Sequence, residues 1–290
     1  MTTVDPAASS GGPTALRIVL GSQLRRLREA AEISRADAGY SIRGSESKIS
    51  RLELGRVGLK ERDVADLLTM YGVTDRTDRE TFLAMVKRSN QPGWWHRFND
   101  LMPDWFQDYV GLEEAATRVQ TYELQFVPGL LQTEDYARAI ASHGRPDSAG
   151  QDVERRVRLR MSRQKILNRP GAPRLWAVID ESVLHRPIGG REIMLAQLDQ
   201  LLALTKQSQI TLQVVPYQLS GYAAEGPFTM LRFGEAELPD LVYIEHLAGA
   251  LYLDKRDEFE LYSRAFDRLT VDALTPDRTR QMLAKARAEI

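Results

Sequence analysis

Apolar residues recur at helical spacing throughout the first third of the chain. Leu20, Leu24 and Leu27 share one face of a predicted helix over residues 17–31, while charged side chains fall on the other faces. The same periodicity predicts four further helices over residues 35–42, 46–54, 61–70 and 75–88. Because helices this short must bury their apolar faces against one another, the pattern indicates a five-helix bundle over residues 14–90.

A tight turn separates the second and third predicted helices. Ser34 precedes the second helix and Asp37 follows three residues later, an arrangement that resembles a capping box. Arg43 and Gly44 then interrupt the helical pattern, and Ser45 is placed to cap the third helix. Two short helices joined in this way predict a helix-turn-helix.

The pattern changes at residues 91–93, where glutamine, proline and glycine predict a domain boundary. Aromatic residues crowd the next sixteen positions, and Pro103 prevents one continuous helix from carrying all of them. We interpret the cluster as a core clasp between the two domains rather than as a binding surface, because buried aromatic side chains usually serve packing. Its members are Trp94, Trp95, Phe98, Trp105, Phe106 and Tyr109.

Helical periodicity continues into the second domain. Residues 111–121, 134–142 and 151–168 are predicted as helices, the second capped by Thr133, and residues 127–131 as a turn leading into helix. The helix over 151–168 is strongly basic, which fits a phosphate or an acidic partner, although we favour a face that is solvated or paired within the protein. Its basic residues are Arg155, Arg156, Arg158, Arg160, Arg163, Lys165 and Arg169.

From residue 173 the pattern becomes that of strands. Alternating or continuous apolar positions predict strands over residues 175–179, 210–215, 228–233, 241–244 and 250–253. A predicted helix over 191–207 indicates a right-handed parallel crossover between the first two strands, and the shorter later connections favour antiparallel pairs. Helices over 258–269 and 276–289 close the chain.

These elements predict an α+β fold: the N-terminal five-helix bundle, followed by a larger helical and mixed β-sheet domain over residues 91–290. Within that domain, residues 91–172 are mainly helical and residues 173–290 form the mixed sheet with its helices. Residues 1–13 are small and polar, lack the features of a secretion signal, and are predicted to be a disordered tail.

Composition narrows the class of protein. The chain is 43% hydrophobic and 27% charged, which is typical of a globular protein with a real core. It has no cysteine, which excludes disulfides and thiolate metal sites and suits the cytoplasm. No apolar run approaches the roughly 20 residues that a membrane-spanning helix needs, so we expect no membrane association.

Charge is distributed unevenly along the chain. The formal net charge is −1, yet residues 14–62 hold eleven basic and six acidic residues, a local charge of +5. Residues 235–260 hold eight acidic and two basic residues, a local charge of −6, which suits either a basic partner or, as we favour, a solvated face. The positive stretch coincides with the predicted helix-turn-helix, so double-stranded DNA is the expected partner.

The third helix would place its first turn in the major groove. Lys48 and Arg51 are suited to donate to guanine, Glu46 is suited to accept from cytosine, and serines suit either bases or phosphates. Arg35, at the start of the second helix, is a candidate phosphate contact. The candidate DNA-binding residues of the third helix and its cap are Ser45, Glu46, Ser47, Lys48, Ser50 and Arg51.

The run KISRLELGR at residues 48–56 resembles the xenobiotic-response-element class of helix-turn-helix regulators, which is related to lambda repressor. The resemblance implies that Ser50 and Arg56 approach the DNA backbone and that Glu53 has a structural role inside the bundle. Two positions depart from the family pattern, because Arg35 and Glu46 replace its usual glutamines. The operator sequence therefore does not transfer from the family.

The turn departs from that family pattern as well. Its glycine appears one place late, as Gly44, which leaves Arg43 where a left-handed residue is often needed. Gly39 stands where the family prefers alanine, which indicates a close approach of the second and third helices.

The rest of the chain resembles a large actinobacterial group of such regulators whose C-terminal domain is uncharacterised. The resemblance lies in GWW at residues 93–95, VPGLLQT at 127–133, LWAVIDE at 175–181 and GPFT at 226–229. It implies an antitoxin-like regulator of development or secondary metabolism, often encoded beside a small partner protein that it binds.

Signatures of enzymes are weak. The four histidines are far apart, and no metal-binding, nucleotide-binding or nucleophile motif is present, so we expect neither a cofactor nor a metal. Asp180 and Glu181 with His185 form the best candidate for acid–base chemistry, although polar residues at a strand end more often cap helices.

The sequence therefore predicts a regulator rather than an enzyme. It would act as a homodimeric repressor or switch, controlled through its C-terminal domain by a small protein or ligand. Alternatives are a sensor whose main output is a protein contact and, less favoured, a hydrolase-like C-terminal domain.

Overall fold

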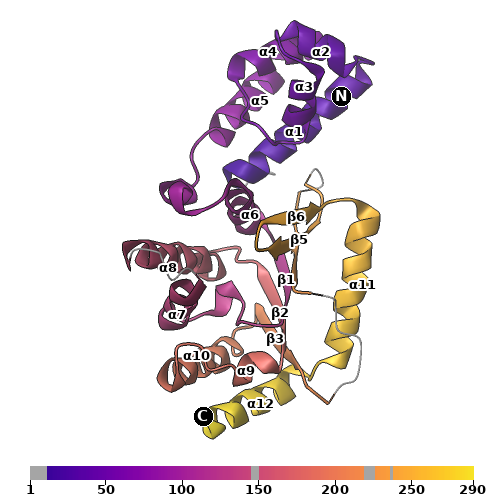
Figure 1. Ribbon diagram of the computed structural model, residues 1–290. Helices are drawn as coiled ribbons and strands as arrows, with labels where there is room; N and C mark the ends of the chain where they lie inside the picture. The colour runs from indigo at the N-terminus through magenta and orange to yellow at the C-terminus, as the bar shows by residue number, and fades with distance from the viewer. Residues whose placement is uncertain (1–11, 145–149, 219–225, 236–237) are drawn as a thin grey trace. The chain divides into compact units, whose positions relative to one another are not determined.

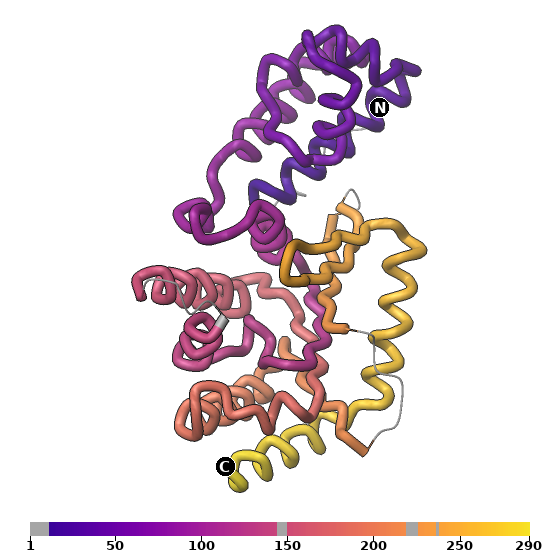
Figure 2. The backbone as a smooth tube through the Cα atoms, viewed as in Figure 1, coloured from indigo at the N-terminus to yellow at the C-terminus, as the bar shows by residue number. Residues whose placement is uncertain are grey.

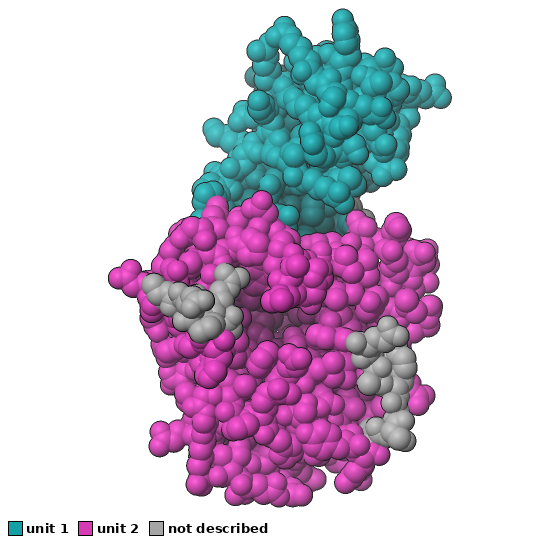
Figure 3. Space-filling view, viewed as in Figure 1, with its two compact units in different colours: residues 1–96, 108–115, 233–239 teal, residues 97–107, 116–232, 240–290 magenta. Residues whose placement is uncertain are grey.

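The computed structural model describes residues 12–144, 150–218, 226–235 and 238–290. The chain divides into two compact units, coloured teal and magenta in Figure 3. The first comprises residues 1–96, 108–115 and 233–239, and the second comprises residues 97–107, 116–232 and 240–290.

The first unit contains the predicted helical bundle (Figure 1). Its helices are α1 (Pro13–Ala30), α2 (Arg35–Ser41), α3 (Glu46–Glu53), α4 (Glu61–Met70) and α5 (Arg76–Ser89). All five predicted helices are confirmed. Helix α1 begins four residues before the predicted start and takes in Pro13, which was assigned to the tail, because proline suits the first turn of a helix. Gly12 precedes the helix as its N-cap, and tail residues 1–11 lie outside the described residues.

Leucines and aromatic residues from all parts of the bundle form its core. Leu20, Leu24, Ile49, Leu52 and Phe82 are each at most 2% exposed and belong to one hydrophobic cluster. Burying each of these side chains contributes about 1.5–3 kcal/mol of transfer free energy. The core therefore fixes α3, which carries Ile49 and Leu52, against the other helices of the bundle.

Pro103 prevents one continuous helix over the aromatic segment, as predicted. The 3₁₀ helix η2 spans Trp94–Leu101, and α6 spans Asp104–Ala115, with Pro103 between them. Within the aromatic cluster, Trp95, Phe98 and Tyr109 are buried, which agrees with a role in packing.

The second unit is built on a six-stranded mixed sheet in the order β3-β2-β1-β4-β5-β6 (Figure 1). Strands β1, β2 and β3 run parallel, and β4, β5 and β6 are joined antiparallel from β1 outward. The parallel pairing of β2 with β3 and the antiparallel pairing of β4 with β5 and of β5 with β6 are as predicted, whereas β4 pairs with β1 rather than with β3. The strands are β1 (Arg118–Glu123), β2 (Arg174–Asp180), β3 (Ile210–Val215), β4 (Phe228–Arg232), β5 (Leu241–His246) and β6 (Gly249–Leu253).

Strand β1 corrects the predicted helix over residues 111–121. Helix α6 ends at Ala115, and β1 pairs with β2 on one side and β4 on the other, with Val119 opposite both Leu175 and Leu231. The helix-forming residues between 112 and 116 extended the predicted helix too far. Pairing partners more than fifty residues away override that local preference.

Helices cover both faces of the sheet, with α7, α8 and α10 on one side and α11 on the other (Figures 1 and 2). Helix α11 packs through Phe259, Phe266 and Leu269 against buried residues that include Tyr122 and Met230. The α-helices of this unit are α7 (Glu134–Gly144), α8 (Gly150–Gln164), α9 (Ser182–His185), α10 (Arg191–Leu204), α11 (Arg256–Asp272) and α12 (Pro276–Glu289).

Helix ends differ from the predictions by a few residues. The helix predicted over 151–168 ends as the 3₁₀ helix η4 (Lys165–Asn168), and the predicted turn over 127–131 leads only into the 3₁₀ helix η3 (Gly129–Leu131). The Thr133 hydroxyl accepts a hydrogen bond from the Tyr136 N–H at 3.2 Å, which confirms the predicted cap of α7. In the described part of the chain, every helix is too short or too polar to cross a bilayer.

Candidate nucleic-acid interface

Side-chain caps fix the starts of both helices of the helix-turn-helix. The Ser34 hydroxyl accepts a hydrogen bond from the Asp37 N–H at 3.1 Å, and the Ser45 hydroxyl accepts one from the Lys48 N–H at 3.2 Å. Each cap satisfies a backbone donor that the first turn of a helix leaves free and contributes about 1 kcal/mol. Both predicted caps are therefore present, and the Ser45 hydroxyl oxygen holds the N-terminus of α3.

The turn between α2 and α3 places Arg43 in the left-handed region, with φ at 51°. The Arg43 N–H donates to the Tyr40 carbonyl at 3.0 Å, and the Gly44 N–H donates to the Gly39 carbonyl at 2.8 Å. Arginine thus adopts the conformation that the resemblance assigns to glycine, at a conformational cost of about 1–2 kcal/mol.

Two glycines allow α3 to lie close to its neighbours. A Cβ atom on Gly39 would lie 2.9 Å from the carbonyl carbon of Ser45, and one on Gly21 would lie 2.4 Å from the carbonyl oxygen of Leu52. Both distances are shorter than a real Cβ tolerates, so any larger residue would displace the backbone. The close approach of α2 and α3 predicted from Gly39 is confirmed.

The two faces of α3 differ sharply in exposure. Ile49 and Leu52 are buried in the bundle, whereas Glu46, Ser47 and Arg51 are exposed. Ser50 is half-buried on the outward side, and Arg56, just beyond the helix, is exposed. The structure therefore brings most of the predicted contact residues onto one accessible face.

Two candidate contacts are already engaged within the unit. The Lys48 Nζ atom lies 2.6 Å from an Asp63 carboxylate oxygen on α4, and the Arg35 Nε atom lies 3.2 Å from Glu53 Oε2. The Arg35 side chain nevertheless remains 38% exposed. Lys48 is turned toward α4 rather than outward, so Arg51 is the better placed of the two predicted guanine donors.

Glu53 has the structural role that the family resemblance implies. Its carboxylate accepts hydrogen bonds from Arg28 Nε at 2.5 Å and Arg28 Nη2 at 3.1 Å, and both side chains are buried. The hydrogen bond that Arg28 donates to Glu53 raises the pKa of Arg28, so the guanidinium stays charged across the ordinary pH range. Burial raises the pKa of nearby Tyr71 to about 12. The pair joins α1 to the end of α3.

Sequence reasoning missed two exposed residues close to α3 in the chain. Tyr40, on α2, is 87% exposed, and the Arg43 side chain in the turn is exposed as well. The signal for Arg43 was present, because a cation in a position suited to glycine is uncommon. No signal in the pattern separated Tyr40 from a core tyrosine.

The best enzymatic candidate shows local structural contacts. Asp180 Oδ1 accepts a hydrogen bond from the Ser182 N–H at 2.9 Å, and Glu181 Oε2 accepts one from the Tyr217 N–H at 2.8 Å. His185 Nε2 lies 3.4 Å from Glu181 Oε1. In the ranges that the structure describes, no three carboxylate or imidazole side chains gather in a way that would hold a metal ion.

A capped helix pair with a tight turn and an exposed polar face on its second helix defines a helix-turn-helix DNA-binding regulator. Residues 19–82 match the family model described as a helix-turn-helix domain. Residues 106–285 match the model of a domain of unknown function, DUF5753, and because this match covers more than half of the chain, the protein belongs to that family. Searches of curated proteins and of solved structures found no match.

Proposed function

We propose that the protein is a sequence-specific transcriptional regulator that reads DNA with α3. The observation that carries the proposal is the outward face of α3, where Ser47 and Arg51 are exposed while Ile49 and Leu52 anchor the helix. Side chains in these positions of a helix-turn-helix reach base edges in the major groove. Arg51 is assigned to base recognition, and Arg35 and Arg56 are assigned to phosphates.

The class of regulator that we propose rests on the resemblance of sequence motifs to known families. The run at residues 48–56 supports membership of the xenobiotic-response-element class, and the motifs of the C-terminal domain support an antitoxin-like cytoplasmic regulator. In this proposal the protein binds as a homodimer, and its C-terminal domain transmits the binding of a small partner protein or ligand. We assign it no enzymatic role, because the Asp180 and Glu181 carboxylates accept hydrogen bonds from nearby backbone groups.

A binding titration tests the central claim. The full chain is titrated with the DNA upstream of its own gene and with random DNA of equal length, at several salt concentrations. We expect a salt-sensitive preference of at least about 10³-fold for the upstream DNA. Equal affinity for both sequences would refute sequence-specific regulation at that site.

Matched arginine variants test the roles of single residues. Arg51→Ala is expected to reduce the preference for the upstream sequence, at a cost of about 1–3 kcal/mol in discrimination. Arg56→Ala should weaken binding to all sequences alike and reduce the salt slope by about one. Arg256→Ala, at an exposed position on α11, removes the same charge and serves as the control. Identical losses for Arg51→Ala and Arg56→Ala would contradict the two assignments.

A further inference from the structure

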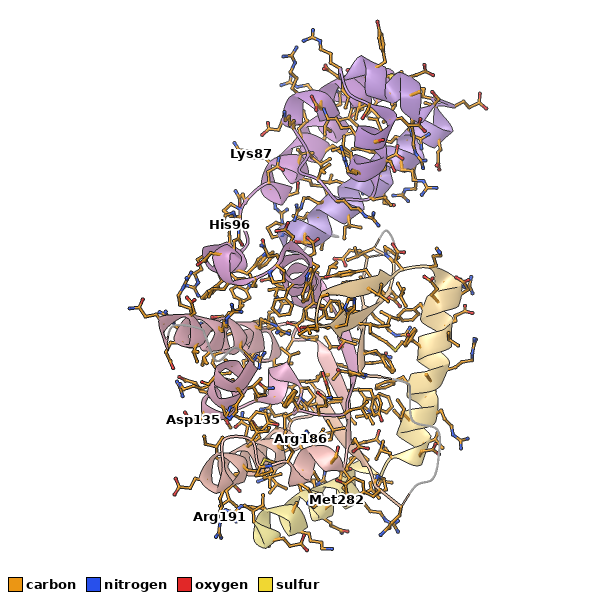
Figure 4. All side chains as sticks on the ribbon, viewed as in Figure 1. Lys87, His96, Asp135, Arg186, Arg191 and Met282 are labelled. Carbon is orange, nitrogen blue, oxygen red and sulfur yellow. The ribbon has the colours of Figure 1, made fainter. Side chains whose placement is uncertain are left out.

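The second unit contains a cavity of about 420 Å³ beside helix α8. Arg97 and Phe98 of η2 form part of its wall, and Glu134 at the start of α7 forms another part. Met161 of α8 also lines the cavity. Figure 4 labels Asp135, the next residue after Glu134, which marks the first turn of α7. This volume falls within the range of small-molecule sites, about 300–1,000 Å³.

Most basic side chains of α8 are engaged within the protein. Arg155 pairs with Asp100 at 2.6 Å, and Arg160 donates to the Gln132 side chain at 2.8 Å. The guanidinium of Arg163 lies 5.1 Å from the centre of the Phe106 ring. These contacts agree with our reading of the basic helix as paired within the protein.

Arg158 of α8 and Lys165, the first residue of η4, depart from this pattern, and both line the cavity. Arg158 and Lys165 are exposed, and among the described residues neither side chain forms an ion pair or a hydrogen bond. Glu134, the carboxylate in the lining, is paired with Arg138 at 2.7 Å. The cavity therefore has a positive charge that the surrounding side chains do not balance.

The spacing of these cations limits the shape of a ligand. Lys165, where α8 passes into η4, follows Arg158 by seven positions, so their Cα atoms are about 10 Å apart on the same side of the helix. Met161 lies between them, and Phe98 is buried below a cation–π contact in which the Arg97 guanidinium is 4.8 Å from the ring centre. A suitable ligand has anionic groups for the cations and a flat apolar part for the Met161 and Phe98 side.

We propose that this cavity binds a small phosphate ester that carries a planar ring, with its phosphates held by Arg158 and Lys165. Guanidinium and ammonium groups are the usual protein partners of phosphate oxygens. Methionine sulfur makes favourable contacts with the edges and faces of rings. The site is separate from α3, and the proposal does not depend on the DNA-binding function.

Calorimetric titration of the full chain with ATP, ADP, AMP and inorganic pyrophosphate tests the site. ATP should bind with an affinity that falls as salt is added, AMP should bind more weakly than ADP, and pyrophosphate should bind more weakly than ADP because it lacks the ring. Absence of measurable heat with millimolar ATP would overturn the proposal, and equal affinity for pyrophosphate and ADP would overturn the assignment of the ring.

Two double variants distinguish binding of ATP in the cavity from nonspecific attraction of ATP to positive charge. Arg158→Gln with Lys165→Gln should lower the affinity for ATP by about tenfold or more. Arg256→Gln with Lys285→Gln removes the same two kinds of charge from α11 and α12, where the side chains are 93% and 75% exposed, and should leave the affinity unchanged. Equal losses in the two double variants would overturn the assignment to this cavity. Circular dichroism of both variants verifies their folding.

Discussion

Arg43 holds a backbone conformation that glycine adopts at lower cost, and its side chain is exposed beside the start of α3. Residues held in a strained backbone conformation cluster at functional sites. The strain at Arg43 therefore indicates that its side chain serves a function rather than the stability of the fold. The turn adjoins the helix that we assign to the major groove, so the simplest contribution is contact with a DNA phosphate.

Replacing Arg43 with glycine is expected to change the stability of the protein and its affinity for DNA in opposite directions. Relief of the left-handed strain should raise the free energy of unfolding by about 1 kcal/mol in urea denaturation. The affinity for all DNA sequences should fall, and the salt slope should decrease by about one. Glu32, with φ at 55°, supplies the control, because Glu32→Gly relieves the same strain without removing a cation. A variant that is more stable and still binds DNA normally would show that the Arg43 side chain is not a contact.

Protonation of the Glu123 carboxyl group affects the free energy of unfolding. Burial raises its pKa to about 7 from 4.5, the nearby Glu245 carboxylate adds to this rise, and Arg160 opposes it. The folded protein therefore keeps a proton that the unfolded chain releases between pH 4.5 and 7, so stability falls as the pH rises through this window.

Substituting Glu123 with glutamine should remove this pH dependence. At pH 8 the variant is expected to be more stable than the parent protein by about 3 kcal/mol, and at pH 4 the two should be nearly equal. Urea denaturation at both pH values provides the measurement. A difference in stability between parent and variant that is the same at pH 4 and pH 8 would rule out the raised pKa.

At the scale of elements, the short distance between α2 and α3 requires a residue without a side chain at position 39. Gly39→Ala would place a Cβ atom 2.9 Å from the Ser45 carbonyl carbon, so α3 would have to shift. We expect a loss of about 1–3 kcal/mol in stability and weaker DNA binding, because the recognition helix moves. Gly150→Ala is the matched control, since nothing lies within 4 Å of a Cβ at that helix start, and it should be neutral or slightly stabilising.

Prediction of elements from sequence succeeded where the information was local. Ser34 and Ser45 mark helix starts through bonds that span three residues, so the helix-turn-helix could be predicted with its caps. The Lys48–Asp63 ion pair spans fifteen residues and the Arg35–Glu53 pair spans eighteen, and no sequence pattern indicated that these cations were engaged. Strand β1 was missed for the same reason, because its partners β2 and β4 are distant in the chain.

At the scale of the whole molecule, the positive stretch over residues 14–62 and the exposed face of α3 lie in the same unit. The net charge of the chain, −1, gives no sign of this stretch. For DNA binding the local field matters more than the sum, because salt screens charges beyond about 10 Å at ordinary ionic strength. The proposed function thus depends on where the charges lie, and a homodimer would double the positive surface that meets the DNA.

A dimeric regulator imposes a spacing on its operator. If two α3 helices enter successive major grooves on one side of the DNA, the centres of the half-sites lie about 34 Å apart, or roughly 10 base pairs. Inserting five base pairs between them turns one half-site to the opposite side, so a dimer would lose one of its two contacts. We expect the affinity to fall by about 10²-fold or more, and a ten-base-pair insertion to restore part of it. Binding that is indifferent to both insertions, together with a one-to-one stoichiometry in sedimentation velocity, would instead establish that a single chain reads the site.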